Sequence, residues 1–584
     1  MQAVILHTIK DVQHCIRNGL HKNATVFSAN INVIYYLKYQ CKIKCQDLSL
    51  YIKIEENQRL QKGALDLSNI LLKELDDKIA PAINEQLDLH MRYFEPLYSY
   101  YAGSRLSAYI QMRHCLSEML INNSFNKIII YQWIDIALEI DHNKKLMDRF
   151  LAINFPNVDF EVIQYGEMTR DKQTVITGLE FYDVKQLPLD IHRCGFIVDE
   201  TSKDLTKSTI LLLELENIPA CFLNQQMTGE NIVRIRINNS ILNATSYQIN
   251  SSILPSKQSL KTIQNAELEL KENLGLLYEV IRNHFCKRIV QYLQAVLAYQ
   301  NFYGNKLIKA VCWEYPQTGR IGAILLEYFI AHSNVPVIGI DDWLKRKMYV
   351  PDIYLPVIAL NRCRYYLSRG SNGIFKDLSL GMPQQNLIID DCSGDMDIKA
   401  VTELEKSTIE VNRKKSEVVF YIPPTYSLMS DGFLYTSIEI QKVLLEICEQ
   451  KAKEVHIICE FNDLGQNALL SMVKNLENIR SFSNGKKYLQ EYMPNLIITS
   501  PNCSFLDGIF QVETNVILVE DTGFIDASLL QTGITFIRNI GIAKRVILEY
   551  FENNIAMKSK QITIDYANLE QVIKQILYSD EKRS

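Results

Sequence analysis

Glycine and proline are scarce in this chain of 584 residues, which contains 23 of the first and 15 of the second. Collagen-like, β-propeller and linker-rich designs use far more of both, so these classes are excluded. No uninterrupted run of about 18 apolar residues occurs, so a membrane-spanning helix is not expected. Hydrophobic residues nevertheless make up 47% of the chain, which excludes a mainly disordered protein.

No sign of charge dominates, because 62 lysines and arginines face 67 aspartates and glutamates, for a net charge of −5. A dedicated DNA-binding surface normally shows as a basic excess, so we expect no nucleic-acid partner. The 13 cysteines are scattered, and the closest pair, Cys41 and Cys45, has no further ligands at zinc-site spacing. We therefore expect reduced thiols, no bound metal and no cofactor.

The opening residues, MQAVILHTIKDVQHC, do not form a signal peptide, because His7, Lys10 and Asp11 interrupt the apolar stretch. We expect a cytoplasmic protein. Peripheral association with the inner face of the membrane and assembly into a homo-oligomer both stay open.

Short apolar runs alternate with segments of helical period, which predicts an α/β fold over parallel sheets. Long helical stretches are expected over 58–122 and 259–303. Residues 366–415 have little period and are interpreted as a connection, so we expect two α/β domains over 1–365 and 416–584. The expected strands are 24–28, 127–131, 160–165, 196–199, 232–235, 307–313, 335–340, 353–360, 418–422, 454–459, 496–499 and 515–519.

The most informative segment follows the expected strand 496–499. Its small polar residues Ser500, Asn502 and Ser504 precede a helix that has Asp507 in its first turn. Free N–H groups at the start of such a helix, together with the helix dipole, suit a phosphate group. Capping of the helix by the same side chains is the alternative, because serine and asparagine commonly do this.

Two further strand ends carry polar residues that could face the same ligand. The expected strand 418–422 runs into Pro423, Thr425, Tyr426 and Ser427, and the expected strand 454–459 runs into Glu460. At the carboxyl end of a parallel strand these side chains are in the usual place for binding a nucleotide or a ribose. An ordinary surface turn and a solvated carboxylate are the alternatives.

The segment 496–521 resembles the donor-nucleotide element of glycosyltransferases with two Rossmann-like domains, known as the GT-B fold. It is also similar to the "TDYSS…D" element of polyglycerol-phosphate transferases. Where a Tyr-Ser-Ser run is usual, this chain has Pro501-Asn502-Cys503, so the pairing of each donor with each phosphate oxygen stays open. The segment 418–435 resembles the first strand and loop of a GT-B C-terminal domain.

A second informative segment covers residues 311–343. A strand ends near Glu314, a turn carries Arg320, and a later strand delivers Asp341 and Asp342 at its carboxyl end. A carboxylate in that position could deprotonate an acceptor hydroxyl or act as the nucleophile of a double displacement. Arg320 is expected to contact the acceptor or an anion. A helix cap, a solvated loop or an ion pair between Glu314 and Arg320 are the alternatives.

The segment 311–343 resembles bacterial surface-carbohydrate biosynthesis proteins, in which a "gipviGiQHG" strand closes the N-terminal domain. This chain has Asp341-Asp342-Trp343 where those proteins have Gln-His-Gly, so their mechanism does not transfer. The segment 93–120 is similar to an aromatic segment that opens a long helix in the same proteins. Tyr101 and Arg105 would then lie near the helix start and could contact an acceptor or an anion, with core packing as the alternative.

The resemblance implies a GT-B-like glycosyltransferase of surface-glycan synthesis, with an N-terminal acceptor domain and a C-terminal domain for the sugar nucleotide. The donor it implies is a CMP-activated acidic keto-sugar, used as a co-substrate, and the acceptor is a glycan or a lipid-linked glycan. Two alternatives stay open. One is a sugar-nucleotide epimerase or a polyol-phosphate transferase, and the other is a non-catalytic scaffold in a glycan-assembly complex.

Overall fold

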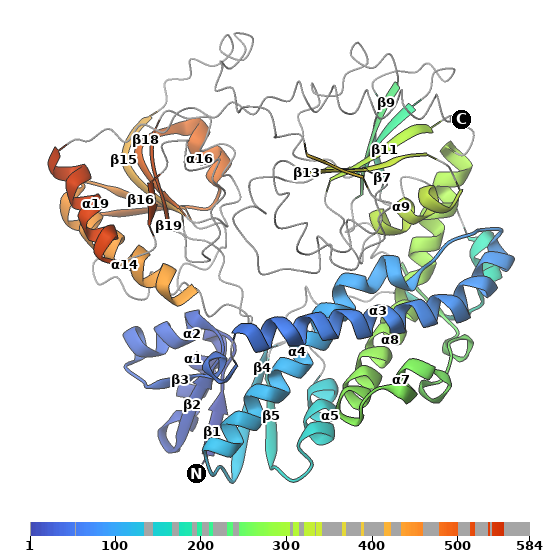
Figure 1. Cartoon of the computed structure of the whole chain (residues 1–584), viewed down its shortest axis with the longest axis horizontal. Helices are drawn as coiled ribbons and strands as arrows, with labels where there is room; N and C mark the ends of the chain where they lie inside the picture. Colours follow the sequence, from blue (N-terminus) through green and yellow to red (C-terminus); the bar gives the residue numbers. More distant parts are fainter. Residues whose placement is uncertain are drawn as a thin grey trace.

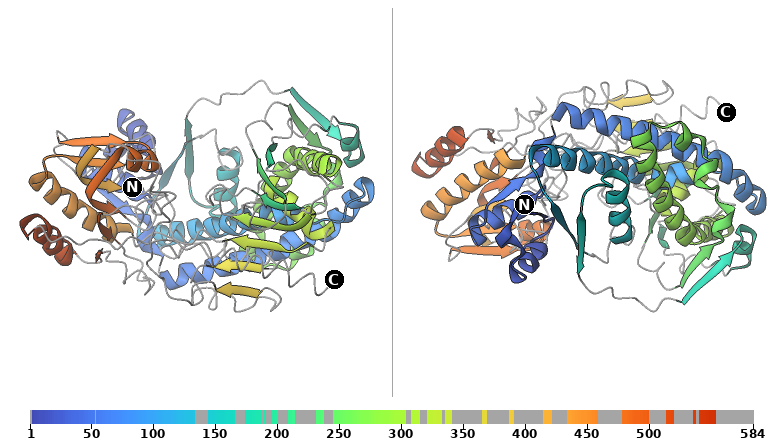
Figure 2. Two further views of the ribbon diagram at one scale, coloured as in Figure 1. Left: turned by 90° about the horizontal axis from the view of Figure 1, so that it is seen from above. Right: turned by 90° about the horizontal axis from the view of Figure 1, so that it is seen from below.

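The fold is an α/β arrangement built on parallel sheets (Figure 1), as predicted. The computed structural model describes residues 2–52, 54–133, 144–165, 174–187, 189, 196–200, 209–213, 231–237, 245–303, 308–314, 321–332, 335–340, 365–368, 387–390, 414–421, 434–458, 478–499, 514–519, 535–537 and 540–553. Three large sheets occupy separate parts of the ribbon (Figure 2). A two-stranded sheet of β6 (Thr174–Leu179) and β10 (Thr245–Ile249) completes the described strands.

The N-terminal sheet has five parallel strands in the order β3-β2-β1-β4-β5. Residues 24–28 were expected to open the fold, but β1 comes before them and pairs with both β2 and β4. With only four residues, β1 is too short to show a strand period beside the helix that follows it. The strands are β1 (Gln2–Ile5), β2 (Ala24–Ser28), β3 (Cys45–Asp47), β4 (Lys127–Trp133) and β5 (Phe160–Tyr165).

The two faces of this sheet are covered by different layers. On one face, α1 (Ile9–Arg17), α2 (Ile31–Tyr35) and the π-helical turn η2 (Tyr36–Cys41) enclose a small core of their own. On the other face, the sheet joins the main core of the molecule through α3 (Ile54–Leu87) and α4 (Phe94–Asn122). The first layer therefore lies outside the main core.

Three long helices, α3, α4 and α8 (Leu268–Tyr303), pack together in the main core (Figure 1). The stretch 58–122 was expected to be helical throughout, but it consists of two helices. The chain reverses after Asp88, whose φ of 56° lies in the left-handed region that interrupts a helix. The shorter helices nearby are α5 (Lys144–Asn154), α7 (Lys261–Asn265) and α9 (Ile321–His332).

The second large sheet has seven strands in the order β14-β13-β12-β11-β8-β9-β7. All neighbours are parallel except β7 and β9. Its side chains Val311 and Trp313 belong to the same core as the long helices. The strands are β7 (Phe196–Glu200), β8 (Thr209–Leu213), β9 (Asn231–Ile237), β11 (Ile308–Glu314), β12 (Val337–Ile340), β13 (Tyr365–Ser368) and β14 (Leu387–Asp390).

The third large sheet has six parallel strands in the order β17-β16-β15-β18-β19-β20 and a separate core. Helices α14 (Leu434–Lys451) and α19 (Ile540–Asn553) pack together on it, and α16 (Gly485–Glu491) leads into β18. The strands are β15 (Lys414–Tyr421), β16 (Val455–Ile458), β17 (Ile479–Phe482), β18 (Tyr492–Thr499), β19 (Asn515–Val519) and β20 (Thr535–Ile537).

The observed strands refine the expected organisation. Range 1–365 contains the N-terminal sheet and most of the second sheet. The last two strands of the second sheet, β13 and β14, reach into the expected connection 366–415. The expected strand 353–360 lies outside the described residues, and the domain boundaries themselves stay a prediction. Among the helices that are described, none combines the length and the apolar character needed to cross a membrane.

Candidate functional site

The third sheet has a point at which its strand order reverses. From β15 the chain builds outward to β16 and β17, and then returns to place β18, β19 and β20 on the other side. The reversal falls between β15 and β18, which are parallel neighbours with Phe420 opposite Ile498. In open parallel sheets, ligands bind beyond the carboxyl ends of the two strands at such a reversal, because the flanking connections diverge there.

The predicted nucleotide-binding residues directly follow these two strands. Ser500 is the next residue after β18, and Pro423 comes two residues after β15. Glu460 follows β16, the neighbour of β15, by two residues. The side chains themselves lie outside the described residues, so their roles stay predictions. The full set outside the described residues is Pro423, Thr425, Tyr426, Ser427, Glu460, Ser500, Asn502, Ser504 and Asp507.

The described part of this edge is almost entirely apolar. Phe420, Ile458 and Val519 are all 1% exposed or less, and Thr499, equally buried, adds one hydroxyl group. Such a floor cannot replace the water around a phosphate group, because burying a charge without hydrogen-bond partners is costly. Donors for a phosphate would therefore have to come from the connections that follow the strands.

The predicted carboxylates are associated with the second sheet in a similar way. Glu314 is the last residue of β11 and pairs with Ile340, the last residue of β12, so Asp341 and Asp342 follow at the same level of the sheet. The order of this sheet reverses between β8 and β11, which makes β11 one of the two flanking strands. The Glu314 side chain and residues Arg320, Asp341 and Asp342 lie outside the described part of the chain.

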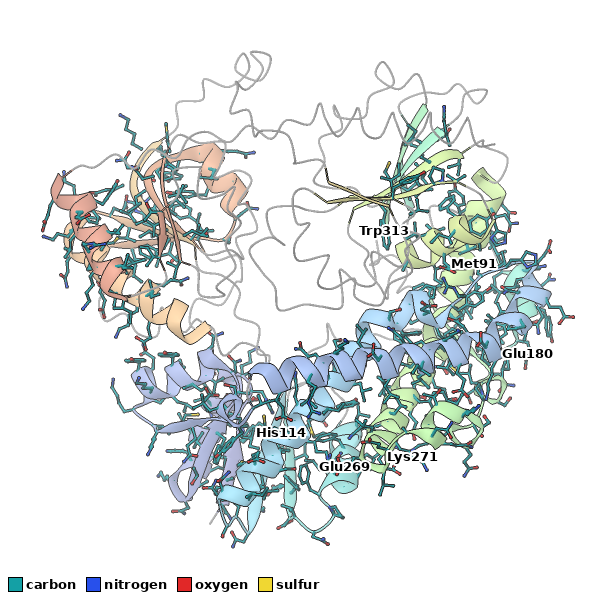
Figure 3. The ribbon with its side chains drawn as sticks, in the orientation of Figure 1. Met91, His114, Glu180, Glu269, Lys271 and Trp313 are labelled. Carbon is teal, nitrogen blue, oxygen red and sulfur yellow. The ribbon has the colours of Figure 1, made fainter. Side chains whose placement is uncertain are left out.

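Trp313 lies immediately before Glu314 and is buried in the main core (Figure 3). Its indole Nε1 has no hydrogen-bond partner within the described structure. A buried indole N–H usually finds an acceptor. The sequence pattern did not indicate this donor, because a tryptophan in an apolar strand is indistinguishable from an ordinary core residue.

Tyr101 and Arg105 are described, and they do not lie at a helix start. The helix α4 begins at Phe94, so both residues are in its interior, where the Arg105 guanidinium carbon is 5.7 Å from the centre of the Tyr101 ring. Tyr101 packs against the main core, and its burial raises the pKa of its hydroxyl, which Arg105 opposes. The expected position was wrong, and a contact of this pair with an acceptor stays a prediction.

The start of α4 is already occupied by a carboxylate of this chain. Asp76 on α3 accepts hydrogen bonds from the backbone N–H groups of Tyr93, Phe94 and Glu95, at 2.6 to 2.8 Å. Burial raises the pKa of Asp76 to about 6, against the lowering effect of these three bonds. The residue was not predicted, because it caps a helix other than its own.

The N-terminal sheet also has a reversal, between β1 and β4. There the described polar groups that follow β1 and β2 satisfy one another, and the residues that follow β4 lie outside the described part of the chain. Asp11 accepts from the backbone N–H groups of His7 and Thr8, and the Asn30 amide donates to the His7 carbonyl while its oxygen accepts from Asn32. These bonds cap α1 and α2, so the polar groups on the β1 and β2 side of this edge serve stability rather than a ligand.

Comparisons with known proteins identify no family: no family model and no curated protein matches. Among solved structures, the chain is similar to UDP-GlcNAc 2-epimerase from Neisseria meningitidis bound to UDP-GlcNAc, with 11% identity and a TM-score of 0.35 over 64% of this chain and 100% of that one. It is also similar to sucrose-phosphate synthase from Thermosynechococcus elongatus, with 9% identity and a TM-score of 0.31 over 51% of this chain and 78% of that one. A third similar structure is a spinosyn forosaminyltransferase, with 10% identity and a TM-score of 0.25 over 49% of this chain and 75% of that one.

Proposed function

We propose that this protein is a glycosyltransferase that binds a sugar nucleotide at the carboxyl edge of the third sheet and transfers its sugar to a glycan acceptor. A CMP-activated acidic keto-sugar is the donor that we propose to test first, on the basis of the sequence resemblance alone. The acceptor that we propose is a glycan or a lipid-linked glycan.

One observation carries the proposal. The loop predicted from sequence to hold a phosphate, Ser500–Ser504, follows β18, and the second predicted loop, which starts at Pro423, follows β15. These strands are the two that flank the reversal of the sheet. The sequence prediction was made strand by strand, whereas the strand order depends on the whole sheet, so the agreement between them is independent support.

The chemistry requires one anion-binding group and one carboxylate. Donors near Ser500 and Ser504 would stabilise the nucleotide phosphate as it leaves with the electron pair of the sugar–oxygen bond. The acceptor oxygen forms the new bond to the anomeric carbon, and its proton passes to Asp341, Asp342 or Glu314. In a double displacement, one of these carboxylates would instead attack the sugar first.

The experiment is a binding titration with the S500A/S504A double variant. We expect the variant to bind the sugar nucleotide at least about tenfold more weakly, because two hydrogen bonds to a charged group are lost. Its melting temperature should remain that of the wild type. If the serines only cap a helix, the result is the opposite, a lower melting temperature with unchanged affinity.

The matched control is S481A/S483A, which removes two exposed serine hydroxyls at the end of the edge strand β17. Because β17 is two strands away from β15, at roughly 4.8 Å per strand, this control should bind like the wild type. A thermal-shift panel of CMP, CDP, UDP and GDP identifies the nucleotide, since bound ligand stabilises the folded state. A shift with none of the four would contradict the proposal, and product analysis separates transfer from epimerisation.

A further inference from the structure

The first 46 residues have a charge balance unlike that of the whole chain. They contain six lysines and arginines and a single acidic residue, Asp11, whereas the whole chain has a net charge of −5. The six basic residues are all exposed in the structure. They are Lys10, Arg17, Lys22, Lys38, Lys42 and Lys44.

These cations belong to one layer of the molecule. They lie on α1, on the turn that follows it, and on η2 with the residues that lead into β3. This layer covers the face of the N-terminal sheet opposite to the long helices, where it encloses a separate small core. The cations therefore belong to the layer outside the main core and not to the contact with α3 and α4. In the ribbon this layer has α14 beside it (Figure 1), where Tyr35 donates to Glu439.

The single acidic residue of this segment does not neutralise the surface. Asp11 is fully buried and accepts from the backbone N–H groups of His7 and Thr8. Among the residues that the structure describes, no ion pair involves Arg17, Lys22, Lys38, Lys42 or Lys44. Elsewhere on the described surface, arginines and lysines pair with glutamates, as Arg149 does with Glu279 and Lys127 with Glu161.

Aromatic rings are interleaved with the lysines on η2. The Lys38 ammonium lies 4.9 Å from the centre of the Tyr39 ring, and the Lys42 ammonium donates to the Tyr39 carbonyl at 2.6 Å. Lys442 on α14 approaches the same ring to 5.4 Å but lies 3.9 Å from Glu446, and Glu439 of that helix accepts from Tyr35. The cationic surface therefore ends where this layer meets α14. Tyrosine and lysine together suit the boundary between water and lipid headgroups, because both side chains carry an apolar body and a polar tip.

We propose that this outer basic layer, formed by α1, η2 and the residues around them, binds an anionic membrane surface. Five of the six cations are lysines, which attract a diffuse negative surface as point charges, whereas recognition of individual phosphodiesters favours the arginine fork. The cations are also spread over several elements of one outer layer, which matches a bilayer better than a single strand of nucleic acid.

The test is co-sedimentation of the full chain with vesicles, without any sugar nucleotide. We expect binding to phosphatidylcholine vesicles that contain about 30% phosphatidylglycerol, and none to pure phosphatidylcholine. The K22Q/K38Q/K42Q/K44Q variant should bind the anionic vesicles at least about tenfold more weakly, because each basic residue near such a surface adds to the attraction. Raising the salt from about 0.1 M to about 1 M should release the wild type.

The matched control, K73Q/K185Q/K287Q/K544Q, removes the same total charge from exposed lysines on other elements and should bind like the wild type. Equal binding of the two variants would overturn the proposal, because net charge alone would then explain the attraction. Binding of the wild type to neither type of vesicle would overturn it too. The proposal would also be overturned if single-stranded RNA displaced the protein from anionic vesicles at a concentration lower than that of the anionic lipid. The layer would then bind a nucleic acid in preference to a membrane.

Discussion

The N-terminal sheet and the third sheet begin with the same strand order, yet their carboxyl edges differ in how their polar groups are used. Both place their fourth strand beside the first, β4 next to β1 and β18 next to β15. In the N-terminal sheet, Asp11 and Asn30 bond to the backbone of the strand ends and cap the helices that follow. In the third sheet, the described edge offers an apolar floor with one hydroxyl, from Thr499.

The difference shows that strand order alone does not identify a binding site. A reversal supplies a place, but a ligand needs donors that the protein has not already used for itself. Two helix starts in the N-terminal half of the molecule are occupied by carboxylates of α3: Asp76 caps α4, and Glu74 accepts from the N–H groups of Lys261 and Thr262 at the start of α7. Four experiments follow, on the edge of the second sheet, on the helix start that Asp76 occupies, on the N-terminal edge, and on the contact between α2 and α14.

The largest expected effect is on the chemical step at the edge of the second sheet. Replacing Asp341 or Asp342 by asparagine should lower kcat at least about 100-fold in one of the two variants, because an amide cannot accept the acceptor proton. Affinity for the sugar nucleotide should stay within about twofold of the wild type. Steady-state kinetics and a binding titration measure the two quantities separately.

The control for the carboxylates is D159N, which changes an exposed aspartate before β5 and should leave kcat unaltered. Full activity in both D341N and D342N would remove these residues from the mechanism and leave Glu314 for test by E314Q. If D341N lost nucleotide affinity together with kcat, the sugar nucleotide would bind at the edge of the second sheet and not at that of the third.

The next effect concerns the helix start that Asp76 occupies. Burial raises the pKa of Asp76 to about 6 from its ordinary 3.8, so between these values the folded protein holds a proton that the unfolded chain has lost. The free energy of unfolding should therefore fall as pH rises from about 4 to about 6, by on the order of 3 kcal/mol. D76N should lack this part of the fall.

Urea denaturation at several pH values measures the difference between wild type and D76N. D77N is the matched control, because Asp77 is the exposed neighbour of Asp76 on the same helix. Identical pH profiles for wild type and D76N would show that Asp76 has an ordinary pKa, so that the three N–H groups balance the effect of burial.

Local sequence patterns predicted strands well where a short β-branched run stands between polar turns. Segments 24–28, 160–165 and 515–519 are strands with those bounds. The pattern did not predict β1, which has four residues, or β8, whose leucines suit a helix equally well. Division of range 1–365 between two sheets depends on long-range pairing, which no local pattern contains.

The candidate site, like the fold, was predictable from sequence only in its local features. Residues after a parallel strand could be named from sequence because they follow a recognisable strand, as Ser500 follows β18. That β18 lies beside β15, and not at the sheet edge, became evident only from the strand order. Asp76 could not be predicted, because the groups that it caps are 17 to 19 residues away on another helix.

A smaller effect is expected at the N-terminal edge itself. N30A removes a hydrogen bond of 2.7 Å to the His7 carbonyl and one of 2.9 Å from the Asn32 N–H group. The free energy of unfolding should fall by about 1–2 kcal/mol, as for other helix caps, with nucleotide affinity unchanged. N18A removes exposed contacts of the Asn18 amide with the His14 carbonyl and ring and should cost less, because solvent can replace them. Weaker nucleotide binding in N30A, at normal stability, would make this edge a ligand site.

The smallest effect is expected where α2 of the N-terminal sheet contacts α14, a helix that covers the third sheet. The Tyr35 hydroxyl on α2 donates to Glu439 on α14 at 2.8 Å, across 404 residues of sequence. A double-mutant cycle of Y35F and E439Q should give a coupling of about 1 kcal/mol in urea denaturation, since Glu439 is only half-buried and solvent weakens the charge. Y36F changes a neighbouring tyrosine and should show no coupling to E439Q.

Because the two regions have separate cores, a coupling of zero would mean that they unfold independently of this contact. A measurable coupling would mean that α2, which is capped by Asn30, also stabilises α14 of the third sheet.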